Sequence, residues 1–163
     1  MSTIYVDNLS PNLGSRVLAA GHVVQVVSNR DTTIYTGTSG AEVYIGSSAS
    51  ITPTSTSSKI LAQVSISAGV RETYSNYAVG FALRRGTTTS GTLIANTRFG
   101  RYDNQTNVTR ELYSTVVLSA LDSPATTSSV TYGIFVGNID GSPIWDVNIA
   151  NHSTMWTLME IAQ

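Results

Sequence analysis

The sequence predicts an all-β protein, an antiparallel jelly-roll β-sandwich, and three observations predict this fold class. Charged residues make up only 12% of the 163 residues, whereas Ser and Thr together make up about a quarter. Thr is branched at Cβ and suits a pleated, half-buried surface, whereas a helical domain needs a charged face that this chain lacks. In several short segments apolar residues also alternate with polar ones, and turn residues separate these segments.

The clearest strand is predicted over Lys59–Val70, where apolar side chains share one face and Gln63, Ser65 and Ser67 share the other. Similar alternation predicts strands over Val23–Ser28, Tyr77–Arg84, Glu111–Leu121, Val130–Val136 and Met155–Ile161. Weaker patterns predict short strands over Thr33–Thr36, Ala41–Ile45, Thr92–Thr97 and Ile144–Ile149. Because eight or more strands are expected and no ten-residue helical pattern occurs, two packed sheets are the predicted architecture.

Residues between the predicted strands favour turns. Gly141 follows Asp140 and tolerates a positive φ, and Gly86 and Gly91 bracket a Thr-rich hairpin loop. Prolines at 53, 124 and 143 fix φ and end strand pairing.

Residues 1–21 differ from the rest because they contain Pro11 and Gly14 and show no sustained period. We expect an N-terminal arm there, followed by one sandwich domain over residues 22–163. The arm carries apolar side chains that need cover from a second chain or another protein, or from their own domain if the arm is an edge strand. These attachment candidates are Ile4, Tyr5, Val6, Leu9, Leu13 and Val17.

Composition excludes several classes of partner. The net charge is −1 and no basic run exceeds Arg84-Arg85, so we expect no nucleic-acid partner. The chain has no cysteine, which excludes disulfides and thiolate metal sites. It shows neither a signal-peptide pattern nor an apolar run of about 18 residues, so we expect no leader and no membrane insertion.

No residue pattern points to catalysis. His22 and His152 are the only histidines, and neither has a second ligand at a metal-binding spacing, so no metal site or other cofactor is predicted. No GxSxG, GxGxxG or P-loop string occurs. We therefore predict no catalytic residue and expect a protein that is not an enzyme.

Two loops are candidates for ligand contact. The loop FGRYDNQTNV mixes residue types that suit adaptable recognition, and the turn from Asp140 to Asp146 combines acids with an aromatic ring on which a sugar could stack. The predicted receptor contacts are Arg98, Arg101, Tyr102, Asp103, Asn104, Asp140 and Trp145. The alternatives are a solvated loop with an interface salt bridge, and a turn in which Asp140 starts the turn while Trp145 fills the rim of the core.

Small residues and a two-sided strand predict subunit contact. Ala78, Gly80 and Ala82 form a smooth stripe, and Gly133 and Gly137 do the same around Phe135. The last strand has Trp156 and Leu158 on one face and apolar groups on the other as well, which requires cover on both sides. We therefore expect a symmetric homo-oligomer, with a trimer favoured.

Four strings resemble small virion proteins of tailed bacteriophages, particularly of phages that infect cyanobacteria. They are TIYVDNLSPNLGSRV, ITPTSTSSKI, ALDSPATTSSVTYGI and TLMEIAQ, spread along the whole chain. The resemblance implies a tail-fibre, appendage or head-decoration module with a jelly-roll fold, in a TNF/C1q-like arrangement, that is commonly trimeric. It also implies a location in the virion after assembly in the host bacterial cytoplasm, an arm that holds other virion proteins, and distal loops that meet host-surface glycan.

Three functions remain as hypotheses. The first is a fibre or appendage module that takes part in host-surface attachment, and the second is a capsid decoration or fibre-connector protein without a receptor role. The third, a glycan depolymerase, is the least favoured because the chain lacks the clustered acids and the length of a β-helical spike.

Overall fold

Every regular element that the structure describes is a β-strand, and no helix occurs among these residues. The computed structural model describes residues 20–72, 76–102 and 109–163, so the attachment candidates of the predicted arm lie outside it. The strands are β1 (Val23–Asp31), β2 (Tyr35–Gly37), β3 (Val43–Ile51), β4 (Lys59–Glu72), β5 (Asn76–Arg85), β6 (Thr92–Tyr102), β7 (Arg110–Asp122), β8 (Val130–Asp140), β9 (Ile144–Val147) and β10 (Thr154–Ile161). Each overlaps a strand that the sequence predicts. No helix capable of crossing a membrane was found in the part of the chain that the structure describes.

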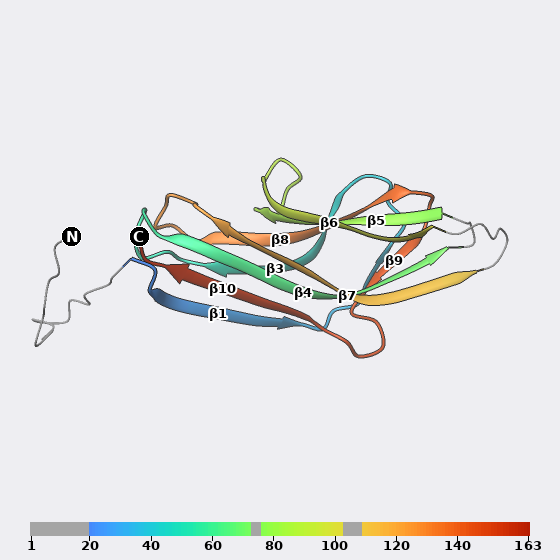
Figure 1. Ribbon diagram of the computed structural model, residues 1–163, viewed down its shortest axis with the longest axis horizontal. Coiled ribbons are helices and arrows are strands. Elements are labelled where there is room, and N and C mark those ends of the chain that lie inside the picture. Colours follow the sequence, from blue (N-terminus) through green and yellow to red (C-terminus); the bar gives the residue numbers. More distant parts are fainter. Residues whose placement is uncertain (1–19, 73–75, 103–108) are drawn as a thin grey trace, which may run out of the picture.

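The strands pair antiparallel into two sheets. Sheet A has the order β1-β10-β4-β9-β2, and β7 pairs with the opposite edge of β4; sheet B has the order β3-β8-β5-β6. Strand β4 is long enough for its first half to pair with β10 and its second half with β9, while β7 follows it along its whole length. In Figure 1, β5, β6 and β8 form the upper layer, and β1 and β10 lie below.

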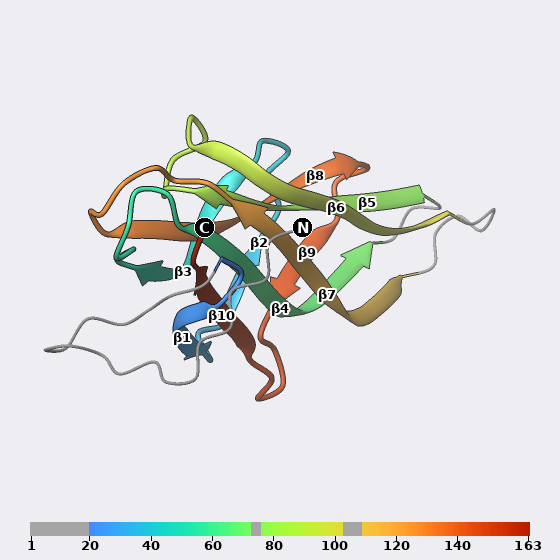
Figure 2. The same cartoon turned by 60° about the vertical axis from the view of Figure 1, so that its left-hand side comes forward.

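The connections between the sheets are those of a jelly roll. The chain changes sheet six times, at every connection except β1–β2, β5–β6 and β9–β10. The long strands therefore stand in the orders β1-β10-β4-β7 and β3-β8-β5-β6, the double Greek key of this fold. The predicted fold class is confirmed, and Figure 2 shows the two sheets from a second side.

The core lies between the sheets and follows the predicted alternation. On β4 all the apolar residues at even positions from Ile60 to Val70 are buried, and on β5 the buried face holds Tyr77, Val79, Phe81 and Leu83. The indole Nε1 of Trp156 donates a hydrogen bond of 3.2 Å to Ser47 Oγ, which links β10 to β3 across the core. Gly141 has a φ of +66°, as its turn requires.

The last strand presents its two faces differently from the prediction. Trp156 and Leu158 are fully buried in the core, so the prediction that they contact a partner subunit is wrong. The outward face of β10 instead holds Met155, which is 46% exposed, and the half-buried Met159 and Ile161. Both faces are apolar, as the sequence indicates, but alternation alone could not say which one lies inside.

The predicted smooth stripe on sheet B is covered by the chain itself. Phe135 is fully buried, with the Tyr44 ring centroid 5.5 Å from its own and the Arg84 guanidinium 5.8 Å above it. Ala78 and Ala82 are also buried, Gly133 lies under the ring of Tyr44, and Gly80 faces the side chain of Ile139. Their own chain buries Ala78, Ala82, Gly133 and Phe135, so their prediction as an oligomer interface is wrong, whereas for the half-buried Gly80 it stays a prediction.

Candidate functional site

The outer face of sheet A changes character along its length. At one end, an apolar side chain from each of four neighbouring strands lies opposite the next, in a row that we call the apolar ladder. The ladder consists of Val26 on β1, Met159 on β10, Leu61 on β4 and Leu121 on β7. Val26 is 55% and Leu121 51% exposed, and Met159 and Leu61 between them are half-buried, so the described residues leave the two ends of this row uncovered.

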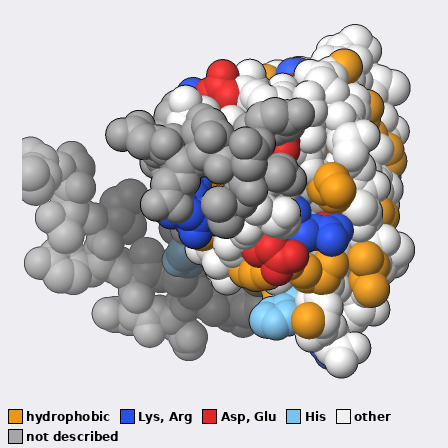
Figure 3. All heavy atoms as spheres, turned by 90° about the vertical axis from the view of Figure 1, so that its right-hand side faces the viewer, with side chains coloured by type: hydrophobic (Ala, Val, Ile, Leu, Met, Phe, Trp, Pro, Cys, Tyr) orange, Lys and Arg blue, Asp and Glu red, His pale blue; other side chains and the backbone are white. Residues whose placement is uncertain are grey.

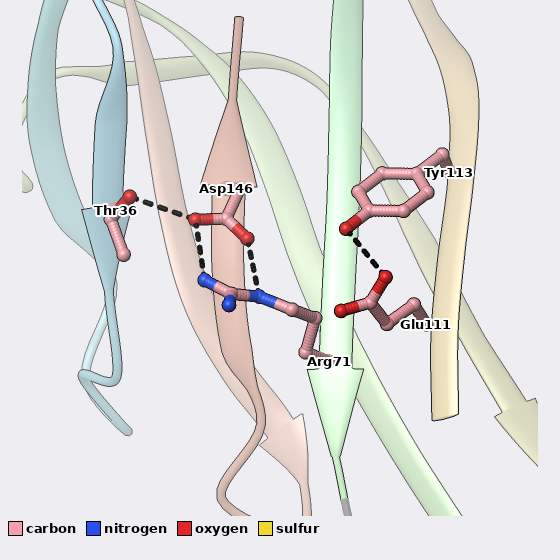
Figure 4. A network of polar contacts seen from close by, with 5 residues as sticks. All are labelled: Thr36, Arg71, Glu111, Tyr113 and Asp146. Atoms are coloured by element: carbon pink, nitrogen blue, oxygen red, sulfur yellow. Dashed lines mark hydrogen bonds and ion pairs between the residues drawn. The ribbon is translucent and has the colours of Figure 1, made fainter. Parts of the chain in front are cut away.

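A polar network occupies the other end of the same face. Asp146 on β9 is almost fully buried, and its Oδ1 accepts a hydrogen bond of 2.7 Å from Thr36 Oγ1. The guanidinium of Arg71 donates from Nε to Oδ2 at 2.9 Å and from Nη2 to Oδ1 at 3.3 Å. Figure 4 shows these groups reaching toward one another from three neighbouring strands. The hydrogen bonds and the charge of Asp146 raise the pKa of Arg71.

A tyrosine ring lies flat on the sheet beside this network. Tyr113 on β7 is paired with Gly69 on β4, and a Cβ added to Gly69 would stand only 2.5 Å from Cε1 of the ring. The glycine therefore makes room for the ring to rest on the backbone. The Tyr113 hydroxyl donates to Glu111 Oε2 at 3.1 Å, and burial together with that carboxylate raises the pKa of Tyr113. The ring remains 49% exposed, so its other side faces solvent.

A hollow of about 450 Å³ opens next to the Tyr113 ring. Its lining combines hydroxyl groups from β4 and β7 with apolar groups and an imidazole from the β9–β10 loop: Ser67, Tyr113, Ser114, Thr115, Ile149, Ala150 and His152. Figure 3 views this end of the sandwich and shows hydrophobic side chains beside charged ones and a histidine.

The β9–β10 loop that walls the hollow is tied down at Asn148. This buried side chain donates to the carbonyl oxygens of Asp31 and Thr33 at 3.0 Å, and its Oδ1 accepts from Thr154 Oγ1 at 2.9 Å. Its backbone N–H donates to Ser67 O at 3.0 Å. Ala150 has a φ of +54°, a conformation that costs a non-glycine residue roughly 1–2 kcal/mol. The loop is therefore held in an unfavourable local shape by the contacts of its neighbours.

The predicted receptor contacts are only partly brought together. Arg98 on β6 forms an ion pair with Asp140 at the end of β8, and both side chains are 43% exposed. Arg101 lies in β6, opposite Tyr77, and is partly buried. Tyr102 ends β6, and its side chain lies outside the described residues, as do Asp103 and Asn104. The contact role of these residues stays a prediction.

The aromatic residue of the predicted sugar-binding turn is not on the surface. Trp145 is only 4% exposed and belongs to the core, so the prediction that its ring stacks on a ligand is wrong. The two acids of that turn also separate, because Asp140 ends a strand of sheet B whereas Asp146 lies in sheet A. The alternative, in which Trp145 fills the core, agrees with the structure.

Sequence reasoning missed the residues around the hollow. Its one usable signal was the alternation in β7, which puts Leu112, Val116 and Leu118 inward and so places Tyr113 on the outer face. Nothing local links Tyr113 to Ser67 or to His152, because three different segments bring them together. Within the described ranges, no group of three His, Asp or Glu side chains is arranged to hold a metal ion.

Comparisons with known proteins give distant structural similarities. No protein-family model and no curated protein matches the chain. Among solved structures, the chain is similar to derived T=1 particles of infectious bursal disease virus, with 12% identity and a TM-score of 0.36 over 98% of this chain and 41% of that one. It is also similar to the VP2 subviral particle of that virus, with 11% identity and a TM-score of 0.35 over 98% of this chain and 42% of that one. The chain thus spans about two-fifths of the length of these proteins.

Proposed function

We propose that this chain is a non-enzymatic structural subunit of a virion, a fibre or appendage module of the tailed-phage kind that takes part in attachment to the host surface. It packs against copies of itself through the apolar ladder, with a trimer as the favoured assembly. Its N-terminal arm holds other virion proteins, and assembly takes place in the bacterial cytoplasm.

The observation that carries this proposal is where the phage-like strings come together. ITPTSTSSKI ends at the start of β4, ALDSPATTSSVTYGI joins the end of β7 to β8, and TLMEIAQ forms the end of β10. Register pairs Lys59 with Ile161 and Ile60 with Asp122, so these distant segments meet at one end of the sandwich. The backbone N–H of Gly21 bonds to Ala162 O, so the first described residues of the chain also lie at this end, whereas the fourth string lies outside the described residues.

The apolar ladder lies at the same end. Leu121 and Met159 belong to two of the strings, and Leu61 directly follows a third. A row of apolar side chains across four strands, exposed at its two ends and half-buried between them, favours cover by another protein surface, because contiguous apolar area of this kind is uncommon on monomers. The strings that resemble virion proteins and the apolar ladder that favours subunit contact thus lie in one region of the molecule.

Sedimentation or light scattering of Leu121→Lys tests the proposal. We expect the unaltered protein to be an oligomer and the variant to have a much lower mass at the same concentration, because a buried lysine charge opposes the contact. Leu93→Lys is the matched control: Leu93 is 45% exposed on β6 of the other sheet, and its substitution should leave the mass unchanged. A monomeric unaltered protein, or equal masses for all three proteins, contradicts the proposal.

A further inference from the structure

We propose that the hollow beside Tyr113 binds a neutral sugar residue. This inference rests on the proposed role in host attachment and deepens it, because it names the ligand class and moves the contact away from the loops that the sequence indicated.

The geometry of the Tyr113 ring points to a stacking platform. One side of the ring rests on Gly69 and its hydroxyl is fixed by Glu111, while the opposite side is open. A pyranose ring has a face of C–H groups that packs against an aromatic face, and a tyrosine already held in place loses little conformational freedom on binding.

The lining of the hollow supplies the polar half of such a site. Ser67 and Thr115, which face each other across β4 and β7, bring hydroxyl groups that both donate and accept hydrogen bonds, which matches the hydroxyl groups on the rim of a sugar. Ile149 and Ala150 provide apolar contact on the loop side. The volume of about 450 Å³ falls within the range of sites for small ligands.

The charges near the hollow favour a neutral ligand over an ionic one. Arg71 is engaged by the Asp146 carboxylate through two hydrogen bonds, and the Glu111 carboxylate accepts the Tyr113 hydroxyl. The Asp146 carboxylate neutralises the charge of Arg71, which lowers the attraction for an anionic ligand, and the Tyr113 hydroxyl already occupies one oxygen of Glu111. A neutral sugar depends on neither charge.

The position of the hollow also suits contact with a host surface. Tyr113 lies eight residues before Leu121 on β7, which separates the hollow from the apolar ladder by about 27 Å along the strand. Copies that associate through the ladder can therefore leave the hollow open. Several hollows on one particle, each binding weakly, then raise the overall affinity for a sugar-bearing surface, because the first contact raises the effective concentration for the next.

Saturation-transfer NMR with a panel of neutral hexoses, deoxyhexoses and N-acetylhexosamines tests this proposal on the full chain. We expect at least one sugar to receive saturation on its ring C–H protons and to lose it at least tenfold in Tyr113→Ala. Tyr113→Phe, which keeps the ring, should retain binding, and Thr115→Met, which fills the hollow from an exposed position, should abolish it. Leu121→Ala is the control at the other end of β7 and should bind as the unaltered protein does, with circular dichroism checking the fold of each variant.

Three outcomes overturn the proposal. If no sugar in the panel binds, or if binding survives both Tyr113→Ala and Thr115→Met, the hollow is not a sugar site. If Tyr113→Ala instead lowers the solution mass of the oligomer, the hollow is a subunit contact. An oligomer that persists without sugar binding leaves the structural role intact and favours a decoration or connector protein, so failure of this inference is distinguishable from failure of the proposed function.

Discussion

The two ends of the outer face of sheet A share the long strands β4 and β7 but meet their surroundings differently. At one end, β4 and β7 contribute Leu61 and Leu121 to an exposed apolar ladder. At the other end, the same two strands contribute Gly69, Arg71 and Tyr113 to a polar network and a hollow. Outward positions recur every second residue along a strand, so the backbone geometry is the same at both ends. The difference between a surface for protein contact and one for a polar ligand therefore comes from the side chains alone.

A buried carboxylate near each end shows a second difference. Asp146 is held by the cation of Arg71 and by one hydroxyl. Glu160, at the ladder end, is fully buried and accepts hydrogen bonds from neutral donors, among them the Gln25 amide and the backbone N–H and hydroxyl of Thr54, each at 2.7 Å. Asp146 therefore neutralises the charge of Arg71, whereas Glu160 links the β3–β4 connection to β1 and β10 through hydrogen bonds.

Removing Asp146 should have the largest effect on stability. Asp146→Ala leaves the partly exposed Arg71 and Thr36 without their acceptor, and we expect a loss of about 2 kcal/mol in the free energy of unfolding, measured by urea titration. Arg98→Ala is the comparison, since it breaks an exposed ion pair and should cost less than about 1 kcal/mol. Equal losses in the two variants would show that burial does not distinguish these pairs.

Low pH should destabilise the protein through the protonation of Glu160 at the ladder end. Burial alone would raise the pKa of Glu160, but hydrogen bonds from Ser58, Gln25 and Thr54 outweigh it, so the pKa lies below its ordinary value of 4.5. The native state therefore binds this proton less readily than the unfolded chain, and the resulting stability is complete above pH 4.5 and is lost as the pH falls through the native pKa.

The variant Glu160→Gln tests this dependence. It should lower the free energy of unfolding at pH 7 by roughly 1.5 kcal/mol, because hydrogen bonds to a charged acceptor are replaced by weaker ones. The difference from the unaltered protein should shrink as the pH falls below 4.5, measured by urea unfolding at several pH values. A difference that stays constant down to low pH would contradict the assigned role of the carboxylate.

The close approach at Gly69 should give a smaller effect than either buried carboxylate, but a more specific one. Gly69→Ala places a Cβ against the Tyr113 ring and should cost about 1 kcal/mol, and this cost should disappear when Tyr113 is already alanine. Thermal unfolding of the two single variants and the double variant measures the coupling. If Gly69→Ala costs the same in both backgrounds, the ring does not rest on this residue.

Much of the fold could be predicted from local pattern. The alternation in Lys59–Val70 identified both faces of β4 correctly, because one face is apolar and the other is not. In β10 both faces are apolar, and there the same pattern could not tell the core face from the exposed one. Trp156 and Leu158 were therefore predicted to face a partner, whereas they face the core. Trp145 misled for a related reason, since a tryptophan beside two acids looks the same in sequence whether it faces the core or solvent.

The sequence by itself determined the strands, their turns and the two-layer fold, because these depend on side-chain period and on residues with restricted backbones. Only the tertiary structure decided that Ser67, Tyr113 and His152 line one hollow and that Val26, Leu61, Leu121 and Met159 form one row. These groups come from segments far apart in the chain, and cross-strand register, which no single segment encodes, sets which of them meet.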